Sequence, residues 1–151
     1  MSPIEQAIDI ATALCMKHEG LSLVPYICPA GYPTIGYGTV YKPDGSKVTM
    51  AHPPISKAVA TQWLVSELRY NYLIGVMKAS PNLIRYPKAL GAITDFAYNL
   101  GVPRYRASTL RRRVLSENWD AVDVELMKWV RGNGRVLRGL QFRRADECTF
   151  T

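Results

Sequence analysis

The stretch that decides both the fold and the candidate site is EGLSLVPYICPAGYPTIGYG, which runs from Glu19 to Gly38. Before it, apolar residues recur at helical spacing from Ile4 to Cys15, and Gly20 follows Glu19, so we expect a helix to end at Glu19. Within the stretch, Pro, Tyr, Thr and Gly are frequent, which favours a β hairpin. The sequence therefore predicts a carboxyl at a helix end, followed by a glycine-rich hairpin.

Glu19, Cys28 and Thr34 supply a carboxyl, a thiol and a hydroxyl from this one segment. A cleft lined in this way can protonate a leaving oxygen and hold a water opposite it, which is the chemistry of glycosidic bond cleavage. A carboxyl near the negative end of a helix and shielded from water keeps its proton more readily, as a general acid requires. The structural alternative is a solvated carboxylate at a helix end, with Thr34 as an ordinary strand residue.

Three tyrosines, Tyr26, Tyr32 and Tyr37, flank the same segment. One interpretation is an amphipathic wall that binds a sugar chain, because tyrosine combines an apolar ring with a polar hydroxyl. The other is β propensity and packing alone. The sequence leaves both interpretations open.

Composition limits the class of protein. The 151 residues, 48% of them hydrophobic, predict one globular domain over residues 1–151. Nineteen Lys and Arg against twelve Asp and Glu give a net charge of +7, which favours an anionic partner: nucleic acid, a membrane face or a cell wall. No helix-turn-helix or aromatic RNA-binding motif is present, so we do not expect nucleic acid binding.

Cysteine use and the N-terminus limit the setting. The odd number of cysteines, three, argues against a disulfide framework, and Cys15 is expected to be a small buried hydrophobe. The cysteines and two histidines lack metal-ligand spacing, so we expect neither a metal nor a cofactor. Ser2-Pro3-Ile4-Glu5 is typical of a helix capping box rather than a secretory signal. No apolar run approaches the ~20 residues of a membrane span, so we expect no stable membrane insertion.

The remaining elements follow from caps, turns and breakers. The Pro-Asp-Gly run predicts a hairpin turn over residues 42–46, and Pro53-Pro54 closes the β region at about residues 21–50. The later pattern predicts helices from Ser56 to Pro81, Pro87 to Leu100, Ser108 to Leu115, Asp120 to Val130 and Val136 to Glu147. The helix that begins at Pro87 is apolar nearly all round and is expected to be the central buried helix.

Several motifs make the chain resemble the phage-type lysozymes, the endolysins of glycoside hydrolase family 24. The likeness covers nearly the whole chain in order, and the spacing of Glu, then Asp or Cys, then Thr is highly specific for that family. The motifs that carry it are Lys17-His18-Glu19-Gly20-Leu21, Pro33-Thr34-Ile35-Gly36-Tyr37-Gly38, Phe96-Ala97-Tyr98-Asn99-Leu100-Gly101, Ser108-Thr109-Leu110, Asn133-Gly134-Arg135-Val136-Leu137 and Gly139-Leu140-Gln141-Phe142-Arg143-Arg144.

The resemblance implies an α+β lysozyme-like fold, with a small β-hairpin lobe, a larger helical lobe and the active-site cleft between them. It implies hydrolysis of the bond between N-acetylmuramic acid and N-acetylglucosamine in bacterial peptidoglycan. Glu19 would be the general acid, Thr34 would position the attacking water, and Cys28 would stand where many relatives have Asp. Arg143, on the last helix, would support the cleft or bind substrate. We expect a monomer that stays in the host cytoplasm until a holin, a separate pore-forming phage protein, releases it to the wall.

Two departures and three alternatives accompany this prediction. Cys28 leaves the stereochemistry open, because a thiol of ordinary pKa is a poor base at neutral pH unless Lys or Arg lowers its pKa. Thr39 stands where the family often has His.

A lytic transglycosylase would need only one acid and would give 1,6-anhydromuramic ends. A cysteine hydrolase would use Cys28 with His18 or His52 as its base, and a non-catalytic wall-binding domain would depend on charge alone.

Overall fold

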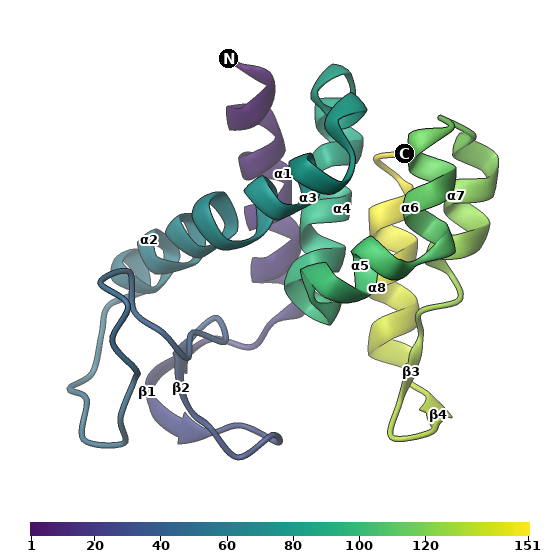
Figure 1. Cartoon of the computed structure of the whole chain (residues 1–151). Helices are drawn as coiled ribbons and strands as arrows, with labels where there is room; N and C mark the ends of the chain where they lie inside the picture. The colour runs from purple at the N-terminus through teal and green to yellow at the C-terminus, as the bar shows by residue number, and fades with distance from the viewer.

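The computed structural model describes residues 1–151 and is mainly helical (Figure 1). The helices are α1 (Pro3–His18), α2 (Lys57–Glu67), α3 (Ile74–Ala79), α4 (Pro87–Leu100), α5 (Val102–Ala107), α6 (Thr109–Leu115), α7 (Trp119–Leu126) and α8 (Arg138–Cys148). The strands are β1 (Ser22–Ile27), β2 (Pro33–Gly36), β3 (Arg131–Gly132) and β4 (Arg135–Val136). A π-helical segment, η1 (Leu68–Leu73), joins α2 to α3, and a 3-10 turn, η2 (Pro81–Arg85), precedes α4. None of the helices combines the length and apolarity needed to cross a bilayer.

Serine caps begin three of the helices. The hydroxyls of Ser2, Ser56 and Ser108 each accept a hydrogen bond of 3.1 Å from the backbone N–H three residues later. Such a bond satisfies one of the N–H groups that the first turn of a helix leaves unpaired, which typically stabilises it by about 1 kcal/mol. The predicted starts of α1, α2 and α6 are therefore confirmed.

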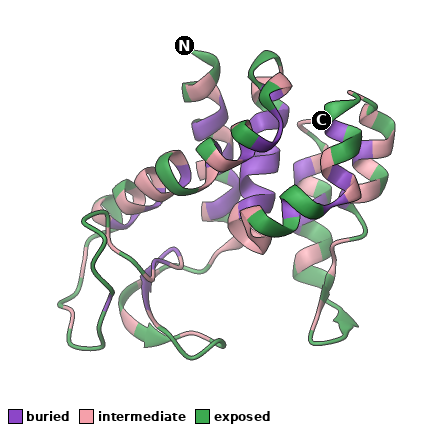
Figure 2. Ribbon diagram, in the orientation of Figure 1, coloured by how far each residue is buried: buried purple, intermediate pink, exposed green.

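Helix α4 is the centre of the helical lobe. Every residue from 89 to 97 is buried, and this run forms the purple centre of the molecule in Figure 2. Gly91 lets α1 approach closely, because a Cβ atom there would lie 2.8 Å from the carbonyl oxygen of Ala7 and 2.8 Å from the Cβ of Ile10. The prediction of a central buried helix is confirmed, and Gly101 ends it with a φ of 100° that favours glycine.

The β lobe is held together by one short antiparallel pair. Strand β1 pairs with β2 so that Tyr26 lies opposite Thr34, and the register shifts between Ser22 and Tyr26, where β1 has extra residues. The predicted turn over residues 42–46 is present, but its flanks form only the single bridge between Tyr41 and Lys47. In Figure 1 this lobe lies below α2, away from the C-terminal helices.

Three details of the C-terminal half differ from the sequence prediction. The helix expected from Asp120 begins instead at Trp119, because the Asn118 side chain caps it, and it ends at Leu126 rather than Val130. Pro103 does not simply terminate α4, since it occupies the first turn of the unpredicted helix α5, where proline is tolerated. The β3–β4 hairpin was also not predicted; its turn uses Asn133 and Gly134, both with positive φ.

Candidate active site

Glu19 lies where α1 ends and the chain turns toward β1. Its backbone is extended, with φ −89° and ψ 140°, and its N–H donates a 2.7 Å hydrogen bond to the carbonyl of Cys15. This cap fixes the backbone at the end of a rigid helix, while the side chain stays 28% exposed. Glu19 is thus accessible to a ligand and held by a well-ordered element.

Arg143 of α8 binds the Glu19 carboxyl. Its Nη1 donates a 2.8 Å hydrogen bond to Oε1 of Glu19, although the two residues are 124 positions apart. The rest of its guanidinium faces Asp95 of α4, with Nε 3.0 Å from Oδ2 and Nη2 2.7 Å from Oδ1. The Cys15 thiol donates a 3.1 Å hydrogen bond to the same Asp95, so three helices meet behind the candidate acid.

A second buried arginine–carboxyl pair lies one layer deeper. Arg144, fully buried, lies 2.7 Å from Glu147 through Nε. Burial alone would raise the pKa of Asp95, but hydrogen bonds from Glu147 and Arg143 lower it. Burial, followed by the hydrogen bond and the charge of Asp95, raises the pKa of Glu147 well above its usual range. The Arg143 guanidinium is thus shared between Asp95, with two hydrogen bonds, and Glu19, with one.

The second carboxyl oxygen of Glu19 faces the β lobe at Gly38. A Cβ atom at Gly38 would lie 3.8 Å from Oε2 of Glu19 and 3.4 Å from the Tyr98 hydroxyl, and φ is +91° there. Tyr98 donates a 2.7 Å hydrogen bond to the carbonyl of Tyr37, which ties α4 to the hairpin. The positive φ therefore favours glycine at the point where the β lobe contacts Glu19 and Tyr98.

Tyr26 lies near all three candidate catalytic groups. Burial raises the pKa of its hydroxyl first, and the nearby charges of Glu19 and Cys28 raise it further. Tyr26 is also the cross-strand partner of Thr34, and directly paired residues project from the same face of an antiparallel sheet. The structure thus gathers Glu19, Cys28 and Thr34 around one tyrosine.

Cys28 sits at the tight turn that follows β1. Hydrogen bonding from the backbone at Tyr32 lowers the pKa of its thiol, and the Thr34 hydroxyl contributes next. Hydrogen bonds, rather than the Lys or Arg that the sequence analysis named as a condition, lower the pKa of this thiol. Thr34 is only 2% exposed, and its hydroxyl lies 2.9 Å from the Tyr32 carbonyl oxygen.

Neither histidine forms a catalytic pair with Cys28. Nε2 of His18 lies 2.7 Å from Asp146, and Nδ1 of His52 lies 2.7 Å from the carbonyl of Pro53, while its ring packs edge-on against Trp63. A cysteine hydrolase needs a base within hydrogen-bond reach of the thiol. The geometry therefore argues against that alternative.

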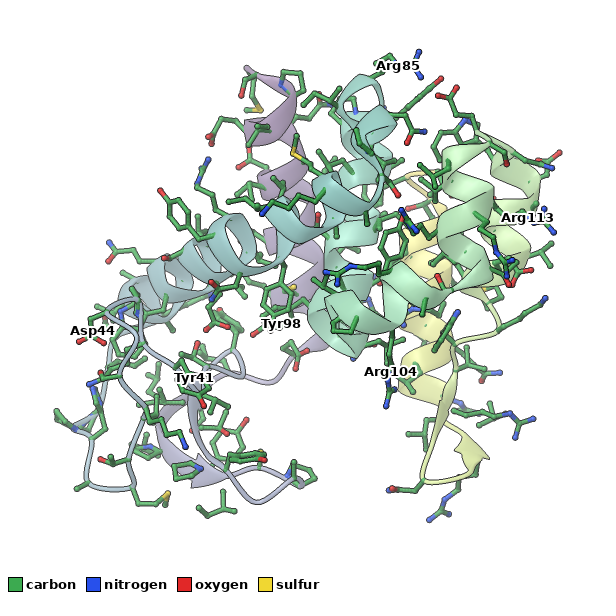
Figure 3. All side chains as sticks on the ribbon, in the orientation of Figure 1. Tyr41, Asp44, Arg85, Tyr98, Arg104 and Arg113 are labelled. Carbon is green, nitrogen blue, oxygen red and sulfur yellow. The ribbon has the colours of Figure 1, made fainter.

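The predicted tyrosine wall is partly wrong. Tyr32 is 54% exposed and lines a cavity of about 390 Å³, but Tyr37, in the turn that follows β2, is 3% exposed and packs in the core. The cavity also contains Tyr41 and Tyr72, which we did not predict. Figure 3 places Tyr41 and Tyr98 on neighbouring sides of the region where the β lobe meets the helices.

The sequence analysis assigned no role to four neighbours of the candidate site: Glu67, Asp95, Tyr98 and Glu147. Only Asp95 carried a usable signal, because it is a charged residue in a helix that is otherwise apolar all round. No group of three or more His, Cys, Asp or Glu side chains is placed to hold a metal ion.

The fold and this constellation define a lysozyme-like protein, and comparison with known proteins identifies the family. A family model described as "Phage lysozyme" matches residues 16–147. The chain is 31% identical over 141 residues to an endolysin of Bacillus phage B103, spanning 91% of this chain and half of that protein. It is 28% identical to an endolysin of Salmonella phage P22, spanning 89% of this chain and 90% of that one.

Solved structures show the same fold. The endolysin from Escherichia coli O157:H7 phage FAHEc1 superimposes with a TM-score of 0.79 at 26% identity, covering 99% of this chain and 92% of that chain. The predicted α+β lysozyme-like fold is therefore confirmed. The chain belongs to the phage lysozyme family, whose members are glycoside hydrolases.

Proposed function

We propose that this protein is an endolysin that hydrolyses the β-1,4 bond between N-acetylmuramic acid and N-acetylglucosamine in bacterial peptidoglycan, with Glu19 as the general acid. The observation that carries the proposal is the position of the Glu19 carboxyl. One oxygen is held by buried Arg143, the other lies beside Gly38 of the β lobe, and the side chain stays 28% exposed. The endolysin relatives support the same class of activity.

In the proposed reaction, Glu19 donates a proton to the glycosidic oxygen as that bond breaks. The leaving sugar acquires a hydroxyl, and the ring left behind carries positive charge in an oxocarbenium-like transition state. The lowered pKa of Cys28 supports a thiolate that stabilises this charge or polarises a water molecule. Thr34, beside Cys28, would orient that water for attack on the face opposite the leaving group, which would invert the anomeric centre.

The experiment is clearing of purified sacculi by wild type and by Glu19→Gln, Cys28→Ser and Thr34→Ala, with analysis of the product ends. The amide in Glu19→Gln keeps an oxygen for the Arg143 bond but has no proton to donate as an acid, so we expect a loss of about 10²–10⁴-fold. Asp9→Asn is the matched control, because Asp9 is an exposed carboxyl on the same helix. Clearing by Glu19→Gln at the rate of the control would exclude Glu19 as the acid.

Product chemistry tests the close alternative. Attack by water leaves a reducing muramic end, whereas a lytic transglycosylase lets the muramic hydroxyl attack and leaves a 1,6-anhydro end. We expect reducing ends. If the wild type gives anhydro ends and Glu19→Gln gives none, Glu19 is still the acid, but the reaction is transglycosylation rather than hydrolysis.

A further inference from the structure

A groove extends from the candidate acid along the side of the β lobe. Its inner part is the cavity of about 390 Å³ that begins at Gly38, beside Glu19. Its outer part is a second cavity of about 290 Å³, and the two share Tyr41, Glu67 and Asn71. This groove, from Gly38 to the outer end at Lys42, is hereafter the Glu67 groove.

Glu67, the last residue of α2, is an unusual group to find at the middle of such a groove. Its Oε1 is buried and has no hydrogen-bond partner, and no Lys or Arg forms an ion pair with it. A largely buried carboxylate with no cation beside it is costly, so the group is expected to keep a proton or to bind a ligand. Burial raises the pKa of Glu67 to about 7, and the Thr39 hydroxyl beside it opposes only part of that shift.

The groups that face Glu67 are hydroxyls and an amide rather than cations. Tyr72 of η1 and Tyr98 of α4 have pKa values raised first by burial and then by the charge of Glu67, which places both near it. Asn71 lines both parts of the groove. The charged residue that lines the outer cavity together with Glu67 is Lys42. Aromatic faces with an amide and a carboxyl are the side chains that bind sugar rings, which need apolar stacking together with hydrogen bonds.

We propose that Glu67 is a substrate-binding residue that donates a hydrogen bond from its carboxyl to a sugar of the glycan strand lying in the Glu67 groove. The proposal rests on the proposed function, because it takes the groove beside Glu19 as the site of the glycan. To that function the proposal adds Glu67 as a residue that binds one part of the glycan strand, and a pH range over which this binding is strong.

The chemistry of the carboxyl decides the pH range. Protonated Glu67 donates to an acetamido carbonyl or a ring hydroxyl, whereas ionised Glu67 only accepts. Ionisation also places a negative charge beside a substrate that carries the lactyl carboxylate of muramic acid. Glycan binding should therefore weaken as the pH rises through about 7.

The test measures binding without turnover. In the Glu19→Gln protein, calorimetry with a peptidoglycan tetrasaccharide of alternating N-acetylglucosamine and N-acetylmuramic acid should give a Kd that rises about tenfold from pH 6 to pH 8. In Glu19→Gln/Glu67→Gln, the amide donates at every pH, so Kd should stay within about twofold across that range. A double variant that keeps the tenfold rise would overturn the role of Glu67, because the pH dependence would then come from another group.

Steady-state measurements separate binding from a purely structural role. Glu67→Ala should raise KM about tenfold at pH 6 and change kcat little, and Glu67→Gln should restore KM. A loss of activity that follows only the unfolding midpoint, with KM unchanged, would show that Glu67 serves the fold. If Glu19→Gln binds no tetrasaccharide at any pH, the proposed function itself fails; if it binds with no pH dependence, only the role of Glu67 fails.

Discussion

Replacing Arg143 by Met tests the clamp behind the candidate acid. Arg143 is 3% exposed and makes three short charged hydrogen bonds, two to Asp95 and one to Glu19. The methionine fills much of the volume but leaves Asp95, which is fully buried, without its cation. Removing one partner of a buried pair typically costs 3–5 kcal/mol. Because the Cys15 thiol still donates to Asp95, we expect a loss at the lower end of that range, about 3 kcal/mol, or roughly 10 °C in Tm for a chain of this size.

The assay is urea unfolding followed by circular dichroism, with the m value compared between variants. Arg138→Met is the matched control, since Arg138 is exposed on the same helix, and we expect it to change stability by less than about 0.5 kcal/mol. Adding Asp95→Asn to Arg143→Met should recover part of the loss, because no uncompensated charge is then buried. A loss below about 1 kcal/mol, or a double variant less stable than Arg143→Met, would refute the reasoning.

Three further outcomes are expected. Gly91→Ala should destabilise by about 1–3 kcal/mol in urea unfolding, because the new methyl meets the Ala7 carbonyl and Ile10; a stabilised variant would mean that α1 can shift freely. Because the pKa of Glu67 is raised, folding binds a proton, and the contribution of Glu67 to wild-type stability is greatest below pH about 4.5 and falls until pH about 7. Glu67→Gln should therefore be more stable than wild type at pH 8, by up to about 3 kcal/mol, and equally stable near pH 4.5. A stability difference between the two proteins that does not vary with pH would contradict the burial of Glu67. The rate of sacculus clearing should fall steeply above physiological salt, because salt screens the attraction between the +7 charge and the wall. A clearing rate that does not change with salt would show that this attraction is unimportant.

Features that depend on neighbouring residues could be predicted from the sequence. The caps at Ser2, Ser56 and Ser108 are local, because each hydroxyl bonds a backbone N–H three residues away. The error at Asp120 is also local: both Asn118 and Asp120 can cap a helix, and in the structure the Asn118 side chain accepts the hydrogen bond from the Ala121 N–H.

The candidate site divides in the same way. The segment that carries Glu19, Cys28 and Thr34 is continuous in sequence, so its residue types and spacing could be predicted. The clamp could not, because Cys15, Asp95 and Arg143 come from three helices that only tertiary packing brings together. Tyr37 was predicted in the wall but lies buried in the turn after β2, where no strand alternation indicates which way a side chain points.

The 124-residue separation between Glu19 and its guanidinium partner also has a consequence during synthesis. Ribosomes add about 5–20 residues per second, so Glu19 precedes Arg143 by on the order of ten seconds. Throughout that interval the nascent chain carries Glu19 without the group that orients it. A helix translated 124 residues after Glu19 thus completes the geometry of that residue, and a product terminated before Arg143 would possess the acid but not its alignment.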